Sequence, residues 1–146
     1  MKIALGSDHR GFIYKEKIKQ FLAAKGIQTE DYGCDSPSSC DYSDFGIKAA
    51  LAVANHNVDF GIVICGSGNG ITMTANKVKG IRAALALNPE MARLARAHND
   101  ANILGLSEMF TPEAELENIV NTFLNTAFEG GRHARRISKI KDFEKG

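Results

Sequence analysis

A glycine-rich segment that follows a buried apolar run is the part of the sequence best suited to chemistry. The run Gly61–Cys65 ends in a cysteine, and Gly66-Ser67-Gly68-Asn69-Gly70 follows it before a helical pattern over 71–77. A strand, glycine loop and helix in this order direct backbone N–H groups toward anions. Such donors favour a thiolate and stabilise negative charge on a substrate. The segment predicts chemistry through an anionic intermediate, with Cys65 as base or nucleophile and Ser67 as an added donor.

Each part of this segment also has a purely structural interpretation. Cysteine is commonly a small buried hydrophobe, and glycines serve tight strand-to-helix turns. The loop is not a P-loop, because no Gly-Lys-Ser/Thr follows it. It is also a poor dinucleotide-binding motif, because no clear acidic residue ends the next strand. A backbone oxyanion site is the better functional interpretation of residues 66–70.

Polar pairs elsewhere in the chain are further candidates. Asp8 and His9 follow the apolar run 2–6, where they could cap the next helix, or bind a sugar hydroxyl and a phosphate. His98 continues an apolar helical stripe and precedes Asn99. A lone histidine on such a stripe is usually a core residue, although its place in the last turn would let it reach a neighbouring cleft.

Two arginines near the C-terminus are spaced for phosphate binding. Arg132 and Arg136 are four residues apart, so they share one face of a helix. Two bare guanidinium groups repel each other there, whereas a phosphate between them would accept forked hydrogen bonds from both. A solvated basic tail over 130–146 is the alternative interpretation.

The sequence offers no pattern typical of a metal site. The four histidines show no ligand spacing, and the cysteines form no Cys-x-x-Cys pair. We therefore predict no metal ion.

The elements that must position these residues alternate between strands and helices. Helical periodicity covers 14–22, 91–98 and 116–124, and Thr111-Pro112-Glu113 is a typical helix start. Alternation of this kind predicts one α/β domain over 1–146, a three-layer, doubly wound, Rossmann-like fold with a five-stranded parallel sheet. A basic helix over about 131–144 lies outside this pattern as a C-terminal extension. The predicted strands are 2–6, 28–32, 59–65, 82–87 and 102–106.

Composition limits the classes of function. A net charge of +1 argues against a general nucleic-acid binder. Three cysteines, an odd number, fit a reducing cytoplasm. The N-terminus turns polar too early for a signal peptide, and no apolar run reaches the ~20 residues of a membrane span. These features predict a cytoplasmic protein that binds neither nucleic acid nor membrane.

Taken together, the motifs resemble those of the ribose-5-phosphate isomerase B family, which also contains galactose- and allose-phosphate isomerases. The resemblance runs nearly from end to end. It rests on the segments 6–9 (Gly-Ser-Asp-His), 41–42 (Asp-Tyr), 64–68 (Ile-Cys-Gly-Ser-Gly), 75–77 (Ala-Asn-Lys), 80–83 (Gly-Ile-Arg-Ala), 91–93 (Met-Ala-Arg), 97–102 (Ala-His-Asn-Asp-Ala-Asn) and 129–133 (Glu-Gly-Gly-Arg-His).

The resemblance implies an aldose–ketose isomerase without cofactor, interconverting ribose 5-phosphate and ribulose 5-phosphate in the pentose phosphate pathway. Cys65 would move the proton between C1 and C2, and His98, helped by Asp8, would open the sugar ring. Family members are dimers or tetramers with active sites between subunits, so the C-terminal helix would pack on a partner. The implied substrate-binding set is Asp8, His9, Tyr42, Gly66, Ser67, Gly68, Asn69, Gly70, Asn99, Arg132 and Arg136.

The sequence departs from the family pattern at three positions. Ser67 stands where threonine is usual, and Asn69 replaces an apolar residue. Met109 stands where an arginine of the phosphate-binding set is usual, and Arg10 is a candidate to compensate for it. Isomerisation of a six-carbon sugar phosphate and non-catalytic binding of a sugar phosphate therefore remain as alternatives.

Overall fold

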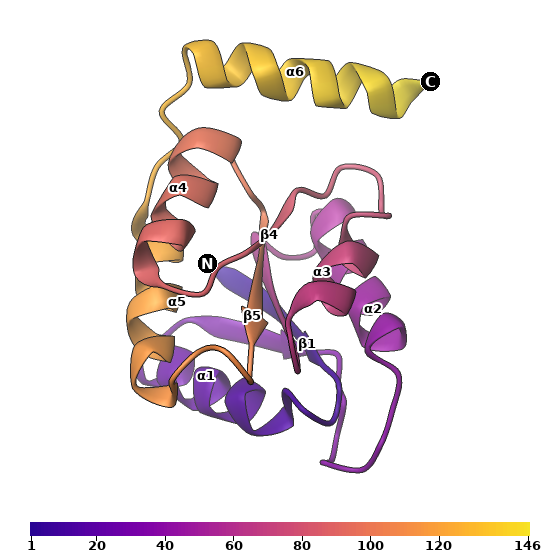
Figure 1. Cartoon of the computed structure of the whole chain (residues 1–146), viewed down its shortest axis with the longest axis vertical. Helices are drawn as coiled ribbons and strands as arrows, with labels where there is room; N and C mark the ends of the chain where they lie inside the picture. The colour runs from indigo at the N-terminus through magenta and orange to yellow at the C-terminus, as the bar shows by residue number, and fades with distance from the viewer.

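Five strands, four of them apolar and one (β2, Gln-Thr-Glu-Asp) polar, pair as one parallel sheet. In the computed structural model, which describes residues 1–146, the strand order is β2-β1-β3-β5-β4, and every pair is parallel. Parallel neighbours need crossover connections, and helices supply them (Figure 1). The predicted doubly wound, five-stranded sheet is confirmed. The strands are β1 (Lys2–Ser7), β2 (Gln28–Asp31), β3 (Phe60–Cys65), β4 (Ala83–Leu85) and β5 (Ile103–Ser107).

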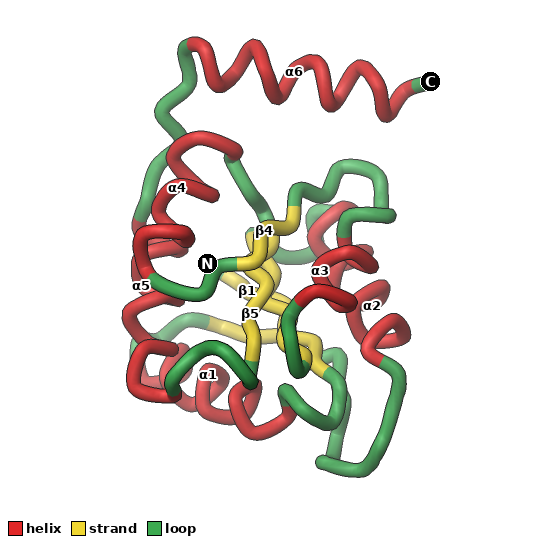
Figure 2. Tube along the Cα trace, in the orientation of Figure 1, coloured by secondary structure: helices red, strands yellow, loops and turns green.

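Helices cover both faces of the sheet, and Figure 2 shows them on either side of the strands. One face carries α1 (Phe12–Ala24), α4 (Pro89–Asn99) and α5 (Leu116–Asn125). The other face carries α2 (Tyr42–Ala54) and α3 (Asn69–Ala75). The sheet therefore forms the middle of three layers.

The alternation of side chains along the strands divides the core between the two faces. Ile3 and Leu5 of β1 pack with the α1, α4 and α5 helices, whereas Ala4 packs with α2 and α3. Val63 and Cys65 of β3 also lie on the α2 and α3 side. Both faces exclude water, and each large aliphatic side chain buried in this way contributes about 1.5–3 kcal/mol.

Local signals in the sequence set the start of α4, the one helix with a side-chain cap. Asn88 caps α4, because its Oδ1 accepts the Met91 N–H at 2.9 Å, and Pro89 follows as the first helical residue. The helix start predicted at 111–113 begins as a short 3-10 turn, η1 (Glu113–Glu115), before α5. β4 is shorter than predicted, because this edge strand pairs only with β5, at three positions.

The basic C-terminal segment forms α6 (Arg132–Lys145), close to the predicted 131–144. Figure 1 shows this helix across the top of the view, beyond the three layers. Only His133 and Ile137 of α6 are buried, and Phe143 is 86% exposed. None of the helices has both the length and the apolar character needed to span a bilayer.

Candidate active site

The carboxyl ends of β1 and β3 form the switch point of the sheet. The chain leaves β1 toward α1 on one face and leaves β3 toward α3 on the other. Ser7 and Ile64 are the last paired residues, so Asp8 and Cys65 follow side by side. The Asp8 N–H donates to the Ile64 carbonyl at 3.3 Å. In open α/β sheets, ligands bind in the crevice at this position.

The loop after Cys65 carries backbone donors without partners. The N–H groups of Gly66, Ser67, Gly68 and Gly70 meet no acceptor within the chain. Ser67 Oγ accepts the Asn69 N–H at 3.2 Å, which leaves the hydroxyl proton of Ser67 free to donate. Four amides and one hydroxyl in the loop that opens α3 are therefore available to an anion, and we call this set of donors the cradle.

The shape of this loop requires glycine at its centre. Gly68 has a φ of +83°, and a Cβ there would lie 2.5 Å from Leu85 Cδ1 and 3.0 Å from the Leu106 carbonyl oxygen. No other residue fits both the left-handed backbone and the space. The glycine that opens α3 is thus required by the packing of the loop on β4 and β5.

Cys65 lies beside the cradle but is buried. Its residue exposure is 4%, and its side chain packs in the apolar cluster with Ile71 and Ala75 of α3. The structural interpretation of a small buried hydrophobe therefore describes its packing in the single chain. Only a group held directly at the glycine loop could contact the sulfur.

Asp8 holds the turn before α1 rather than capping the helix, whose N-cap is Gly11 and carries no side-chain cap. Its Oδ1 accepts the N–H groups of Arg10 and Gly11, both at 3.0 Å, while Oδ2 has no partner in the chain. His9 Nδ1 accepts the Cys40 N–H at 3.3 Å. A neutral His9 ring then carries its proton on Nε2, which can donate to a ligand.

Three more side chains surround the loop. The ring of Tyr42, the first residue of α2, lies against Gly70. Arg10 and Met109 lie beside Gly66, with Cγ of Arg10 and Sδ of Met109 at 3.7 and 3.6 Å from the position of a Cβ there. Arg10 is also held by an ion pair with Glu108 at 3.0 Å.

Ser107 is a residue of this site that the sequence analysis missed. Its Oγ donates to the Gly66 carbonyl at 2.8 Å and accepts the Phe110 N–H at 3.0 Å. The side chain therefore fixes the glycine loop against the turn after β5. A polar residue that closes the apolar run 103–106 was the available signal.

The remaining predicted residues lie at the other end of the sheet, near the starts of the strands. The α4 helix runs back from the end of β4, so its last residues, His98 and Asn99, lie near the strand starts. Arg82, just before β4, donates from Nε to the Asn99 carbonyl at 3.0 Å. Figure 1 shows α6, with Arg132 and Arg136, at this same end of the molecule. One chain alone therefore does not bring His98 to Cys65.

His98 belongs to a cluster with His133 and Glu129 at this end of the molecule. Its ring stacks on that of His133, with centroids 4.2 Å apart and planes inclined by 10°. Glu129 Oε1 lies 3.8 Å from His98 Nε2 and 3.7 Å from His133 Nε2. The three groups could all offer ligand atoms to a metal ion. The linear spacing of the histidines could not show this, because His98 and His133 come from different helices.

Charge accumulates beside this cluster. Arg132 and Arg136 are exposed and enter no ion pair within the chain. Burial lowers the pKa of His133, and the positive charges of His98, Arg132 and Arg136 lower it further, while Glu129 opposes them. The surface next to His98 is therefore suited to an anion.

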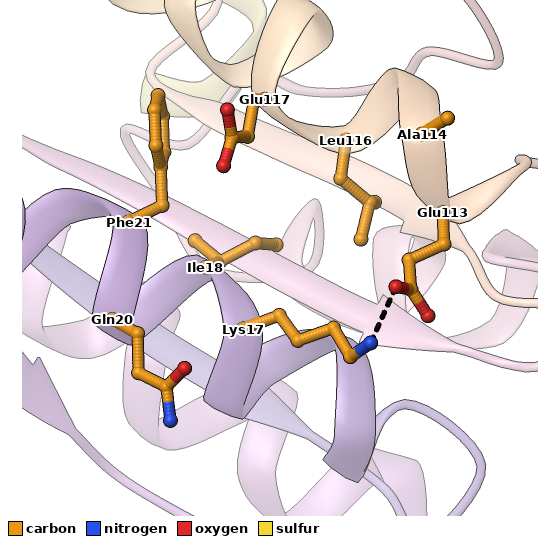
Figure 3. Close-up of a pocket in the computed structure, with 8 residues that line it drawn as sticks. All are labelled: Lys17, Ile18, Gln20, Phe21, Glu113, Ala114, Leu116 and Glu117. Carbon is orange, nitrogen blue, oxygen red and sulfur yellow. Dashed lines mark ion pairs between the residues drawn. The ribbon is translucent and has the colours of Figure 1, made fainter.

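A separate hollow lies away from all of these residues. It has a volume of about 550 Å³ and lies between α1 and the η1–α5 segment. Figure 3 shows Ile18, Phe21 and Leu116 in it, with the ion pair of Lys17 and Glu113 across one side. None of the predicted site residues lines this hollow.

Comparison with known proteins agrees with this fold. Residues 3–140 match the family model for ribose/galactose isomerases. The chain is 44% identical to a putative sugar phosphate isomerase of Bacillus subtilis, covering 99% of this chain and 97% of that protein. It is 42% identical to ribose-5-phosphate isomerase B of Escherichia coli, covering 98% and 96%.

Solved structures give the same result. Ribose-5-phosphate isomerase B of Clostridium thermocellum superposes with a TM-score of 0.98 at 50% identity, covering 99% of this chain and 98% of that one. The enzyme of Mycoplasma genitalium with bound ribulose 5-phosphate gives 0.94 at 44% identity, covering 99% and 96%. The fold and the matches define an aldose–ketose isomerase of the sugar-phosphate class. The chain belongs to the ribose/galactose isomerase family.

Proposed function

We propose that this protein interconverts ribose 5-phosphate and ribulose 5-phosphate through an enediolate and without a cofactor. The observation that carries the proposal is the set of unpaired N–H groups at Gly66, Ser67, Gly68 and Gly70, directly beside Cys65. Moving a carbonyl from C1 to C2 requires removal of a proton from carbon, which leaves charge on two oxygens. Each fixed donor that meets such an oxygen is worth about 2.7–4 kcal/mol in comparable sites.

Cys65 is the proposed group that moves the proton between C1 and C2. Its low exposure suits this role, because a base shielded from water exchanges its proton with the bound sugar rather than with solvent. Ser67 adds a hydroxyl donor to the cradle, and Asn69 lies in the same loop. Tyr42 and the free Oδ2 of Asp8 would contact sugar hydroxyls at the mouth of the loop.

The proposed phosphate site combines His9 with Arg132 and Arg136. The two arginines lack partners in the chain and lie one helical turn apart, so they repel each other until an anion binds between them. A dianionic phosphate would accept forked hydrogen bonds from both. The far end of the sugar is thereby fixed, which orients C1 and C2 at the cradle.

The complete site is proposed to form between two copies of the chain. His9 and Cys65 lie at the carboxyl ends of the strands, whereas His98, Asn99 and the two arginines lie at the opposite end of the molecule. In a symmetric homodimer, or a tetramer of two such dimers, each copy would supply one half to each of two sites. His98 of one copy would then open the ring of a sugar bound at Cys65 of the other. The α6 helix would pack on the partner, and its exposed Ile140 and Phe143 offer an apolar surface for this contact.

A second candidate function is isomerisation of a six-carbon sugar phosphate. The observation that favours it is Met109, which lies beside Gly66 where the family resemblance implies an arginine. A thioether binds no phosphate, so the phosphate could lie elsewhere on a longer sugar. Arg10 is the proposed substitute, because its side chain also lies beside Gly66.

An aldose–ketose assay with purified protein tests these alternatives. We expect turnover of ribose 5-phosphate with a kcat/KM at least tenfold above those for allose 6-phosphate and galactose 6-phosphate. The reverse order would select the six-carbon function. Binding of sugar phosphates without turnover of any of them would overturn both proposals in favour of non-catalytic binding. The proposed location of this reaction is the cytoplasm.

A further inference from the structure

The proposed function assigns a proton transfer to His98, and the structure surrounds this ring on two sides. We infer that Glu129 and His133 are positioning residues for His98: a carboxylate that faces its Nε2 and a flat ring that fixes its plane. The inference rests on the proposed function only for the role of His98. The arrangement of the three side chains belongs to the single chain.

The backbone holds both partners in place. The Glu129 N–H donates to the Ala97 carbonyl at 3.0 Å, which ties the segment before α6 to the last turn of α4. His133 lies on the buried face of α6 together with Ile137, and the His133 residue is only 7% exposed. The ring of His133 is therefore confined, while the side chain of His98 is 35% exposed and free on its other face.

The stack restricts the orientation of His98. With centroids 4.2 Å apart and planes inclined by 10°, rotation of the His98 ring about its χ2 would break the contact. Glu129 Oε1 then lies on the Nε2 side, at 3.8 Å, which a small movement would shorten to a hydrogen bond. An acid–base group held this way presents Nδ1 or Nε2 in one direction to a substrate.

The charges around the stack divide the two rings into different roles. The charged groups near them are Glu90 and Arg93 on α4, Glu129, and Arg132 and Arg136 on α6. The lowered pKa of His133, caused first by burial, favours the neutral form of this ring. His133 thus supports the His98 ring by stacking. The carboxylate of Glu129 can then stabilise a proton on His98.

Chelation of a metal ion is a weaker interpretation of the same three groups. Zinc bonds of about 2.0–2.2 Å place tetrahedral ligand atoms about 3.4 Å apart, whereas Glu129 Oε1 lies 3.7 and 3.8 Å from the two nitrogens. Nearly parallel rings also direct their lone pairs in parallel rather than toward one point. Arg132 and Arg136 add positive charge that opposes a cation.

Kinetics of matched variants test the inference. We expect Glu129→Gln to lower kcat about tenfold with little change in KM, and to shift the pH profile of kcat. His133→Ala should lower kcat similarly, and His133→Phe should restore it to within about threefold, because phenylalanine keeps the flat ring. Arg135→Ala, an exposed residue of the same helix, is the matched control and should match the wild type. Wild-type kcat and pH profile in both Glu129→Gln and His133→Ala would overturn the inference.

Proton NMR of the His98 ring separates this inference from the proposed function. Stacking on His133 imposes a ring-current shift on the His98 ring protons, which His133→Ala should remove and Glu129→Gln should retain. An unchanged His98 signal in His133→Ala would overturn the stack even if the protein is an isomerase. If His98→Asn keeps full turnover, the role of His98 fails while the stack stands. Inhibition by micromolar zinc that Glu129→Gln relieves would overturn positioning in favour of chelation.

Discussion

The aromatic ring of Tyr42 lies directly against the backbone of Gly70. A methyl group on Gly70 would come within 2.6 Å of both Cε1 and Cζ of the ring. Because Tyr42 begins α2 and Gly70 lies in the first turn of α3, this contact joins two helices at the mouth of the glycine loop. The Tyr42 ring can occupy this position only because residue 70 has no side chain.

Gly70→Ala should displace Tyr42 and weaken substrate binding. Tyr42 is 43% exposed, so its ring can turn outward, and alanine favours a helix over glycine by up to about 1 kcal/mol. We expect an unchanged or slightly raised melting temperature and a KM raised about tenfold, the equivalent of one hydrogen bond. In a Tyr42→Ala background, Gly70→Ala should have little further effect. Equal effects in both backgrounds would show that the contact is irrelevant to binding.

Cys65→Ala should lower kcat by 10²–10⁴-fold, on the order expected for loss of a general base, with KM nearly unchanged. Steady-state kinetics measure this directly. Cys34→Ala is a matched control, because Cys34 is also 4% exposed and plays no part in the proposed chemistry. If both variants turn over substrate equally well, Cys65 is only a core residue.

Arg136→Ala should raise KM for ribose 5-phosphate about tenfold or more and leave kcat less affected, because the lost contact lies far from the reacting carbons. Inhibition by inorganic phosphate should weaken by a similar factor. Arg135→Ala, one residue away and equally exposed, removes the same charge from a different face of α6. A similar loss in both variants would indicate a general electrostatic effect rather than a site.

The sequence was sufficient for the fold and for half of the site's arrangement. The alternation of strand and helix patterns located the five strands, and the polar residues that follow β1 and β3 placed Asp8 and Cys65 at the same end of the sheet. A cap on α1 was one interpretation of Asp8, and the structure corrects it, because Asp8 bonds the turn before the helix and Gly11 is the N-cap. Ser107 and the stack of His98 on His133 were missed, because both depend on contacts between segments distant in the chain. The apolar periodicity of one helix does not indicate which other helix packs against it.

Stability should depend on pH through a buried ion pair. Lys15 is fully buried and donates to Asp31 Oδ2 at 2.7 Å. Burial by itself would raise the pKa of Asp31, but hydrogen bonds from Lys15, Lys19 and the Gly33 amide outweigh it and lower this pKa. A carboxyl with a lowered pKa in the folded state contributes stability above its unfolded pKa, and this is lost as the pH falls through the folded value.

Asp31→Asn should therefore cost on the order of 3 kcal/mol at pH 7, because it removes the closer of the two carboxylates that pair with the buried Lys15 ammonium and leaves only Glu16, at 3.3 Å. The difference from the wild type should shrink as the pH falls below about 4. Urea unfolding across this range measures both. Asp142→Asn, which breaks an exposed pair with Lys145, should cost less than about 1 kcal/mol. A difference that stays constant down to pH 2 would exclude this titration as its origin.

Mixed assembly tests whether the site is shared. Cys65→Ala and His98→Asn should each be nearly inactive alone. Subunits exchanged between the two variants should recover up to about one quarter of wild-type activity, because half the dimers are mixed and each holds one intact site. No recovery after exchange, verified by mass spectrometry of the mixed dimers, would place the complete site within one chain.

Cys65 and His98 lie at opposite ends of the strands, and this separation has a consequence for how the proposed activity depends on assembly. In the proposed shared site, a lone subunit would be folded but inactive, because it would hold only one half of the catalytic groups. Dilution, or any molecule that covers the partner-binding surface of α6, would then stop catalysis without unfolding the sheet. Catalytic output would rise with the square of the subunit concentration wherever the subunits are mostly apart.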